Sequence, residues 1–201
     1  MTDPAAAMIA YQPSFDWFES HPDGAVTAYS NISLAPGVMR RLSDELFINN
    51  WSRIVVGPCI EGAVFEVRFV EAPAVRYSDG YLTVDLGPWH FHLCIDEHKG
   101  SSSEELRRNR PVAKAALYER RGKGCAGGRT WGIRLWNGYG EQMTTVFLPN
   151  PRLTDDMQFI KMPDWNRLEL YYKLRATYLG EPMPTDLQLA AELPWPELPF
   201  A

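Results

Sequence analysis

The segment W-H-F-H-L-C-I, residues 89 to 95, carries the side chains of this sequence that are best suited to chemistry. Successive side chains of a strand point to opposite faces, so His90, His92 and Cys94 share one face. The other face is apolar and is expected to be core, with Trp89, Phe91, Leu93 and Ile95. Two histidines at this spacing have Cα atoms roughly 6.6 Å apart, so both imidazoles can converge on one ion. The pattern therefore predicts a pair of metal ligands.

A metal site needs further ligands beyond this pair. Cys94 lies roughly 13 Å from His90 along an extended strand, so those two side chains are not expected to share an ion. Just after the strand come Glu97 and His98. We predict His90, His92 and His98 as the metal ligands, with Glu97 or a residue of a neighbouring strand as the substitute for His98. The alternative is structural: one histidine bonds a backbone carbonyl and the other faces solvent.

Two neighbouring strands place further polar groups opposite their apolar faces. In residues 63 to 70, Arg68 is on one face of the strand, and the apolar Phe65, Val67 and Phe69 are on the other face. In residues 130 to 136, Arg134 and Trp136 are on one face, and the other face is formed by Trp131, Ile133 and Leu135. If all the apolar faces turn toward helices, the polar faces form one surface. The predicted cofactor-binding residues are Arg68, His90, His92, Arg134 and Trp136.

This surface suits either a divalent metal or a haem-like anionic molecule. In the haem version, His90 or His92 is the axial ligand, and Arg68 and Arg134 pair with the propionates. Trp136 supplies a wall on which a ring can stack. The alternative is a solvated sheet face on which Glu66, Arg68 and Arg134 pair with one another across strands.

The glycine-rich segment G-K-G-C-A-G-G-R, residues 122 to 129, is a second candidate. Lys123 and Arg129 would lower the pKa of the Cys125 thiol, and glycines let backbone amides approach a ligand. A Cys125-dependent enzyme is therefore a further hypothesis, which requires that a base such as His90 or His92 lies nearby. The alternative is an ordinary surface connection.

The elements that must position these residues are mostly strands joined by tight turns. Ser78-Asp79-Gly80 between residues 74–77 and 81–86 predicts a hairpin, and Asn137-Gly138-Tyr139-Gly140 joins strands at 130–136 and 142–148. Helices are expected at 36–50, at 101–109 with a kink or fresh start at Pro111 that runs to about Arg121, at 164–179, and at 185–193. The last of these begins with a capping box of Thr185 and Gln188, and Gly180 ends the helix before it.

This order of elements predicts an α+β fold with an antiparallel sheet of about six strands and helices packed on one face. A parallel nucleotide-binding sheet is disfavoured, because neither G-x-G-x-x-G nor G-x-x-x-x-G-K-[ST] follows a strand. We expect residues 1–180 to form a single domain. The Pro-rich tail, residues 181–201, is expected to dock on that body or on a partner subunit.

Composition excludes several classes of protein. The chain has 201 residues, of which 45% are hydrophobic, and this apolar content excludes a mainly disordered state. Its net charge of −5 and the lack of a dense basic run argue against nucleic-acid binding. Three widely spaced cysteines indicate no disulfide framework. The lack of a basic leader and of a long apolar run predicts a cytoplasmic protein with no membrane contact.

The leading hypothesis is a protein of unknown function that binds a small molecule or metal through its histidine-bearing sheet face. The alternative is an interaction protein that forms homo-oligomers, such as a homodimer, through its aromatic and Pro-rich C-terminal region. These patterns do not decide whether the protein is an enzyme.

Overall fold

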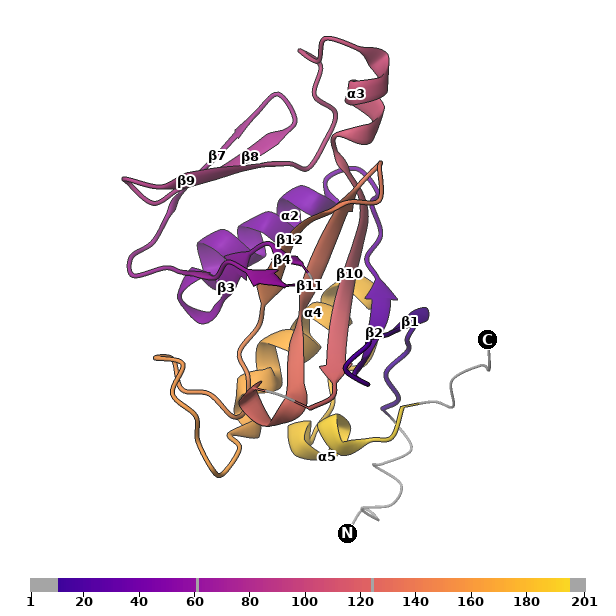
Figure 1. The fold of residues 1–201 in the computed structure, drawn as a ribbon, viewed down its shortest axis with the longest axis vertical. Helices are drawn as coiled ribbons and strands as arrows, with labels where there is room; N and C mark the ends of the chain where they lie inside the picture. Colours follow the sequence, from indigo (N-terminus) through magenta and orange to yellow (C-terminus); the bar gives the residue numbers. More distant parts are fainter. Residues whose placement is uncertain (1–10, 61, 124, 196–201) are drawn as a thin grey trace. The chain divides into compact units, whose positions relative to one another are not determined.

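The computed structural model describes residues 11–60, 62–123 and 125–195. It has the expected α+β architecture, with a large antiparallel sheet of seven strands and a few helices (Figure 1). The strands of this sheet follow the order β1 (Trp17–Ser20), β2 (Val26–Asn31), β10 (Val112–Arg121), β11 (Arg129–Asn137), β12 (Gln142–Phe147), β3 (Val55–Gly57) and β6 (Val67–Arg68). Two smaller sheets are β4 (Cys59–Ile60) with β5 (Ala63–Val64), and β7 (Ala74–Ser78), β8 (Tyr81–Asp85) and β9 (His90–Cys94).

The chain folds as two compact units, and β10 and β11 contribute to both. The first unit comprises the described residues up to Asn31, Leu117–Gly132, and those from Leu148 onward. Its helical segments are η3 (Cys125–Gly128), η4 (Trp165–Leu168), α4 (Glu169–Leu179) and α5 (Leu187–Glu192). The apolar stripe predicted for residues 164–179 is buried at Leu168 and Tyr172, and Gly180, at φ 72°, ends α4 as expected.

A buried ion pair fixes the chain where it leaves α4. The Arg175 side chain is fully buried, and its Nε and Nη2 donate to both carboxylate oxygens of Glu181, at 2.7 and 2.6 Å. Nη1 also donates to the Tyr171 hydroxyl at 2.9 Å. A buried guanidinium is tolerated because its donors are satisfied in this way.

The second unit comprises Ile32–Ala116 and Ile133–Phe147. Its helices are α2 (Val38–Asp44), the π-helical turn η1 (Glu45–Asn49), the 3₁₀ turn η2 (Trp51–Arg53) and α3 (Glu104–Asn109). The helix predicted at 36–50 is confirmed, because α2 continues directly into η1. The inner face of the three-stranded sheet packs on α2 and η1. The Tyr77 hydroxyl donates to Asp44 at 2.6 Å, and the rings of Phe91 and Phe47 lie 5.7 Å apart.

The predicted helix from Pro111 to Arg121 is wrong, because these residues form the strand β10. Four consecutive residues, Ala115, Ala116, Leu117 and Tyr118, are at most 1% exposed. Burial on both faces is typical of a central strand, and β10 lies between β2 and β11. Its place in the sheet overrides the helical propensity of an alanine-rich sequence.

Three smaller expectations also fail. The strand predicted at 63–70 is divided, because β5 pairs with β4 and β6 pairs with β3; Phe65, between them, is 64% exposed. Trp89 precedes β9 and is 75% exposed instead of buried. The helix predicted at 185–193 is present as α5, but its cap is Asp186, which accepts from the Leu189 amide at 2.9 Å, and not Thr185.

The predicted hairpin of β7 and β8 is confirmed, with Ser78 paired to Tyr81 across the Asp79-Gly80 turn. Both turn residues have positive φ, 44° and 83°, as a type I′ turn requires. Gly80 is also approached closely: an added Cβ would lie 2.4 Å from the Glu97 carbonyl oxygen and 2.6 Å from that of Asp96.

Gly80→Ala is therefore expected to lower the free energy of unfolding by about 2 kcal/mol or more, through backbone strain and this clash. Gly87→Ala is the matched control, because Gly87 has φ 80° but nothing within 4 Å of an added Cβ; its cost is about 1 kcal/mol. Urea unfolding measures both variants. Equal losses would contradict the close approach of residues 96 and 97.

Candidate functional site

The outer face of the three-stranded sheet brings polar side chains together in register. Asp85 pairs with His90, and Thr83 pairs with His92 on one side and Arg76 on the other. The opposite face is apolar, with Leu82, Val84 and Leu93 at most 5% exposed. His90 and His92 are both exposed, so the predicted placement of both imidazoles on one side of a strand is confirmed. We call this surface the imidazole face; it comprises Arg76, Tyr81, Thr83, Asp85, His90 and His92.

The two imidazoles are neighbours, with ring centroids 5.1 Å apart and planes at 65°. His92 Nδ1 shares a hydrogen bond of 2.8 Å with Thr83 Oγ1. When Nδ1–H donates in this bond, the lone pair on Nε2 is left for a ligand; when the hydroxyl donates, Nε2 carries the proton. The direction of this hydrogen bond therefore decides whether Nε2 of His92 carries a proton or can bind a ligand.

A pair of opposite charges borders the histidines. Asp85 forms an ion pair with Arg76 and accepts a hydrogen bond of 3.0 Å from the Gly87 amide. The Gly87 amide, with the Arg76 guanidinium, holds the pKa of Asp85 below its usual range. The carboxylate next to His90 is therefore ionised at neutral pH and already has partners.

His98 is held away from the other two histidines by its own contacts. Its Nδ1 lies 3.0 Å from Arg110 Nη1, its Nε2 lies 3.2 Å from Asp79 Oδ2, and its ring contacts Tyr81 edge to face at 5.1 Å. Because arginine has only donors, Nδ1 of His98 accepts here, which places the ring proton on Nε2, facing Asp79. Both nitrogens are engaged, so His98 has no lone pair to offer a metal in this arrangement.

The predicted metal ligands are thus brought together only in part. Within residues 11–60, 62–123 and 125–195, no group of three or more His, Cys, Asp or Glu side chains is arranged to hold a metal ion. His90 and His92 form a pair, and His98 belongs to the Asp79–Arg110 cluster. Coordination through this pair would have to be completed by water or by a ligand.

The other predicted cofactor-binding residues lie on a different sheet. Arg68 is on β6, and Arg134 and Trp136 are on β11, both in the seven-stranded sheet, whereas β9 belongs to the three-stranded sheet. The expectation of a single surface built on adjacent strands was wrong. Arg68, Arg134 and Trp136 each already have a partner within the chain, and Lys114 Nζ lies 5.0 Å from the centroid of the Trp136 ring.

Thr83, Asp85 and Arg76 were not predicted from the sequence, although a signal for them was present. The Asp79-Gly80 turn pairs Ser78 with Tyr81, and counting by two from that pair places Arg76 opposite Thr83. The missing step was the register of β9 on β8, which depends on the bend at Leu86–Trp89. There the Leu86 amide donates to the Trp89 carbonyl at 2.7 Å.

The side chain of Cys125 lies outside the described residues, so the hypothesis of a reactive thiol stays a prediction. Arg129, one of the two basic residues expected to activate it, forms an ion pair with Glu119 and donates to the Ala191 carbonyl at 2.5 Å. That guanidinium therefore has other partners.

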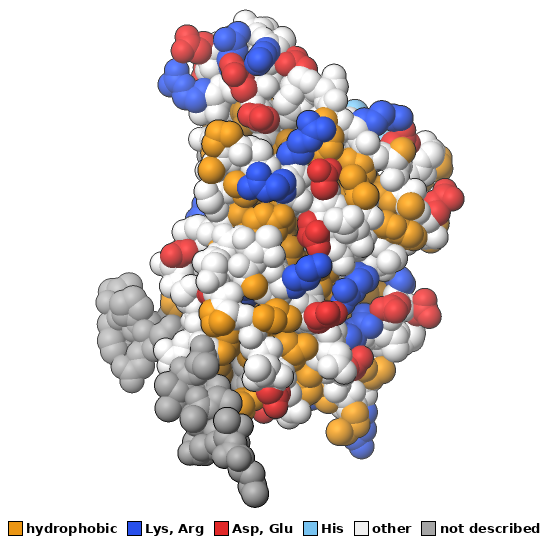
Figure 2. Space-filling model, turned by 180° about the vertical axis from the view of Figure 1, so that it is seen from behind, with side chains coloured by type: hydrophobic (Ala, Val, Ile, Leu, Met, Phe, Trp, Pro, Cys, Tyr) orange, Lys and Arg blue, Asp and Glu red, His pale blue; other side chains and the backbone are white. Residues whose placement is uncertain are grey.

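The face of the molecule drawn in Figure 2 carries charges of both signs. On the face drawn in Figure 2, Lys and Arg side chains are interspersed with Asp and Glu among the residues that are coloured. None of the helices in the described part of the chain combines the length and the apolar character needed to cross a bilayer.

Comparisons with known proteins identify the family but no function. The chain belongs to the family described as "Family of unknown function (DUF7676)", whose model matches residues 16–180. A solved structure described as "Structure of the Heme Binding Protein ChuX" is similar at 17% sequence identity and a TM-score of 0.46, covering 77% of this chain and 78% of that chain. This likeness is too distant to support an argument about a ligand. No curated protein matches the chain.

The carboxylate of Asp79 gives a prediction about pH. The Gly100 amide, and then the Lys99 amide and the His98 ring, hold the pKa of Asp79 below its usual range. A carboxyl with a lowered folded-state pKa stabilises the fold above its ordinary value of about 3.9, and this contribution is lost as the pH falls through the lower folded value. Asp79→Asn keeps the turn, because asparagine tolerates positive φ, but it removes the charge.

We expect Asp79→Asn to unfold at lower urea concentration than the wild type at pH 7, and the difference to shrink at pH 3. Glu104→Gln is the control, since it removes a charge from an exposed ion pair of 3.6 Å with Arg108. A pH-independent difference for Asp79→Asn would contradict the role given to its carboxylate.

Proposed function

We propose that this member of a family of unknown function binds a small ligand at the imidazole face, with His90 and His92 as ligands of a divalent transition metal. Water or a small molecule would occupy the remaining coordination positions. A metal with open positions can hold a ligand or take part in a reaction, and the proposal does not depend on which.

The observation that carries the proposal is the spacing of the two rings. A metal about 2.1 Å from a ring nitrogen lies about 3.2 Å from the ring centroid, so two imidazoles at a tetrahedral angle have centroids about 5.2 Å apart. The rings of His90 and His92 are 5.1 Å apart. Small rotations of these exposed side chains, which cost little, would turn one nitrogen of each ring toward a shared ion.

Thr83 supports the same proposal. A histidine that binds metal through one nitrogen usually donates the other N–H to a fixed acceptor, which sets the tautomer and the orientation of the ring. Thr83 Oγ1, 2.8 Å from His92 Nδ1, is such an acceptor. Metal binding at Nε2 would select the tautomer in which Nδ1–H donates to this hydroxyl.

Haem or a similar anionic ring is the second candidate, and Trp89 favours it. Trp89, directly before β9, is 75% exposed, and this apolar side chain could be covered by a haem ring bound near the strand. Against it, Arg68 and Arg134, expected to pair with propionates, lie on strands of the other sheet. The metal ion therefore fits the imidazole face better than haem does.

The interaction hypothesis finds less support in the described part of the tail. The centroids of the Trp195 and Phe15 rings lie 5.9 Å apart, and the Arg121 guanidinium lies 4.4 Å from the centroid of the Trp195 ring. Trp195 thus contacts its own chain, while residues 196–201 lie outside the described residues. A homodimer and a cytoplasmic location stay predictions.

Zinc titration by calorimetry, on protein purified without a histidine tag, tests the proposal. We expect one Zn²⁺ per chain for the wild type and no stoichiometric binding for the His90→Ala, His92→Ala double variant. Thr83→Val is expected to weaken binding about tenfold, as loss of an orienting partner does. His21→Ala is the control, because His21 belongs to the first unit and bonds Thr27 Oγ1 at 2.7 Å.

Equal zinc binding by the wild type and the double variant would overturn the proposal, as would a wild type that binds no zinc. A haemin titration separates the two ligands. A Soret shift that the double variant loses, in a protein that binds no zinc, would replace the metal ion by haem.

A further inference from the structure

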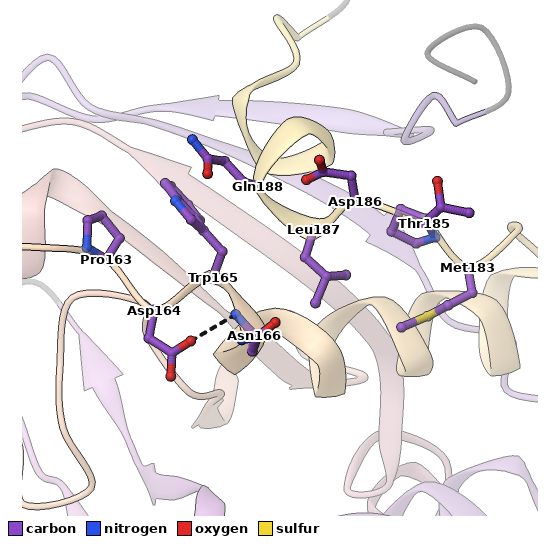
Figure 3. Close-up of a pocket in the computed structure, with 10 residues that line it drawn as sticks. Pro163, Asp164, Trp165, Asn166, Met183, Thr185, Asp186, Leu187 and Gln188 are labelled. Atoms are coloured by element: carbon purple, nitrogen blue, oxygen red, sulfur yellow. Dashed lines mark hydrogen bonds between the residues drawn. The ribbon is translucent and has the colours of Figure 1, made fainter. Parts of the chain in front are cut away.

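A groove in the first unit is built from two segments that each lead into a helix (Figure 3). One wall is Pro163–Asn166, at the start of η4, and the other is Met183–Gln188, at the start of α5. Its volume is about 600 Å³, within the range of small-molecule sites, and it is open to solvent. We call it the acidic groove; it shares no residue with the imidazole face.

Both walls are fixed by hydrogen bonds within the chain. Asp164 Oδ1 accepts from the Asn166 amide at 3.1 Å, the bond drawn in Figure 3, and the Asp164 amide donates to the Pro151 carbonyl at 2.8 Å. Asp186 Oδ1 accepts from the Leu189 amide at 2.9 Å. The buried Arg175–Glu181 pair holds the chain two residues before Met183. The groove is therefore formed before any ligand arrives.

The charged residues that line the groove favour a positively charged ligand. Asp164 and Asp186 are the charged residues among the ten described residues that line the groove, and none of the ten is basic. Each carboxylate uses one oxygen, Oδ1, for a cap, which leaves Oδ2 for a ligand. An anion would be repelled here, whereas a cation would be attracted.

The apolar side chains narrow the class of cation. The half-buried indole of Trp165 belongs to the first wall of the groove, and Trp is the ring that holds cations best. Met183 and Leu187 add aliphatic surface on the opposite wall. A hydrated metal ion gains nothing from contact with this apolar surface, whereas the alkyl group of an alkylammonium ion can be buried against it. We propose that the acidic groove binds a small organic ammonium ion, held by Trp165 and by the carboxylates of Asp164 and Asp186.

The segment that forms the second wall, Met183–Gln188, lies beyond residues 16–180, the span matched by the family model. The site is therefore a property of this chain that the family match does not cover. It is also independent of the imidazole face, so either proposal can fail without the other.

Amide and indole NMR spectra test this inference, with tetramethylammonium and butylamine as probes and butyrate as the anionic counterpart. Trp165→Phe identifies the Trp165 indole resonance. We expect at least one ammonium probe to shift that resonance and the side-chain amides of Asn166 and Gln188 in a saturable way, and butyrate to shift none of them. Binding of tetramethylammonium alone would point to the indole, and binding of butylamine alone to the carboxylates; either supports the proposal.

The variants are chosen so that the fold survives. Asparagine is as good a helix cap as aspartate, so Asp164→Asn and Asp186→Asn should keep both caps while each weakens binding about tenfold. Asp155→Asn is the matched control, because it removes the same charge from an exposed residue paired with Arg167, outside the groove. Absence of a saturable shift with both ammonium probes would overturn the proposal, and so would equal weakening by Asp155→Asn.

Discussion

The Asp79-Gly80 turn is the constraint on which the arrangement of the imidazole face depends. Its two positive φ angles set the register of β7 on β8, and the Gly80 carbonyl accepts from the amides of Ile95 and Asp96 at 2.9 and 3.1 Å, which ties the end of β9 to the turn. The Asp79 carboxylate then accepts from Lys99 and Gly100 and faces His98. Together with the bend at Leu86–Trp89, the turn therefore fixes the side chains that face His92, and it holds the His98 ring against Asp79.

The chemistry proposed for this face follows from strand geometry and hydrogen-bond direction. Cross-strand pairing puts Thr83 beside His92, and a hydroxyl there can hold the imidazole in the tautomer whose outer nitrogen is a ligand. Asp85 and Arg76 neutralise each other beside His90, so they add little net charge to the face. The acidic groove works differently: its carboxylates have no basic partner in the lining, and its selectivity rests on charge and on the indole of Trp165.

Local sequence patterns predicted which residues form strands and turns better than they predicted which strands pair with one another. Alternation from His90 to Leu93 and the Asp-Gly turn are properties of a few neighbouring residues, and both are confirmed, whereas Trp89 is exposed and Cys94 is buried. Membership of a sheet is not local: residues 63–70 divide into β5, which pairs with β4, and β6, which pairs with β3, and β7, β8 and β9 form a sheet of their own. The segment Ala115–Tyr118 has helical propensity but becomes a central strand, because its burial is decided by β2 and β11. Arg68 and Arg134 were assigned to the site on the assumption of one sheet, and that assumption failed.

The most direct test of the metal-binding account is the protonation state of each ring nitrogen, observed in long-range ¹H–¹⁵N spectra of the imidazoles with and without Zn²⁺. The account predicts that zinc moves the Nε2 resonances of His90 and His92, that His92 then carries its proton on Nδ1, and that His98 keeps its proton on Nε2. A zinc-loaded protein in which His92 is protonated on Nε2, or in which only His98 responds, would contradict it.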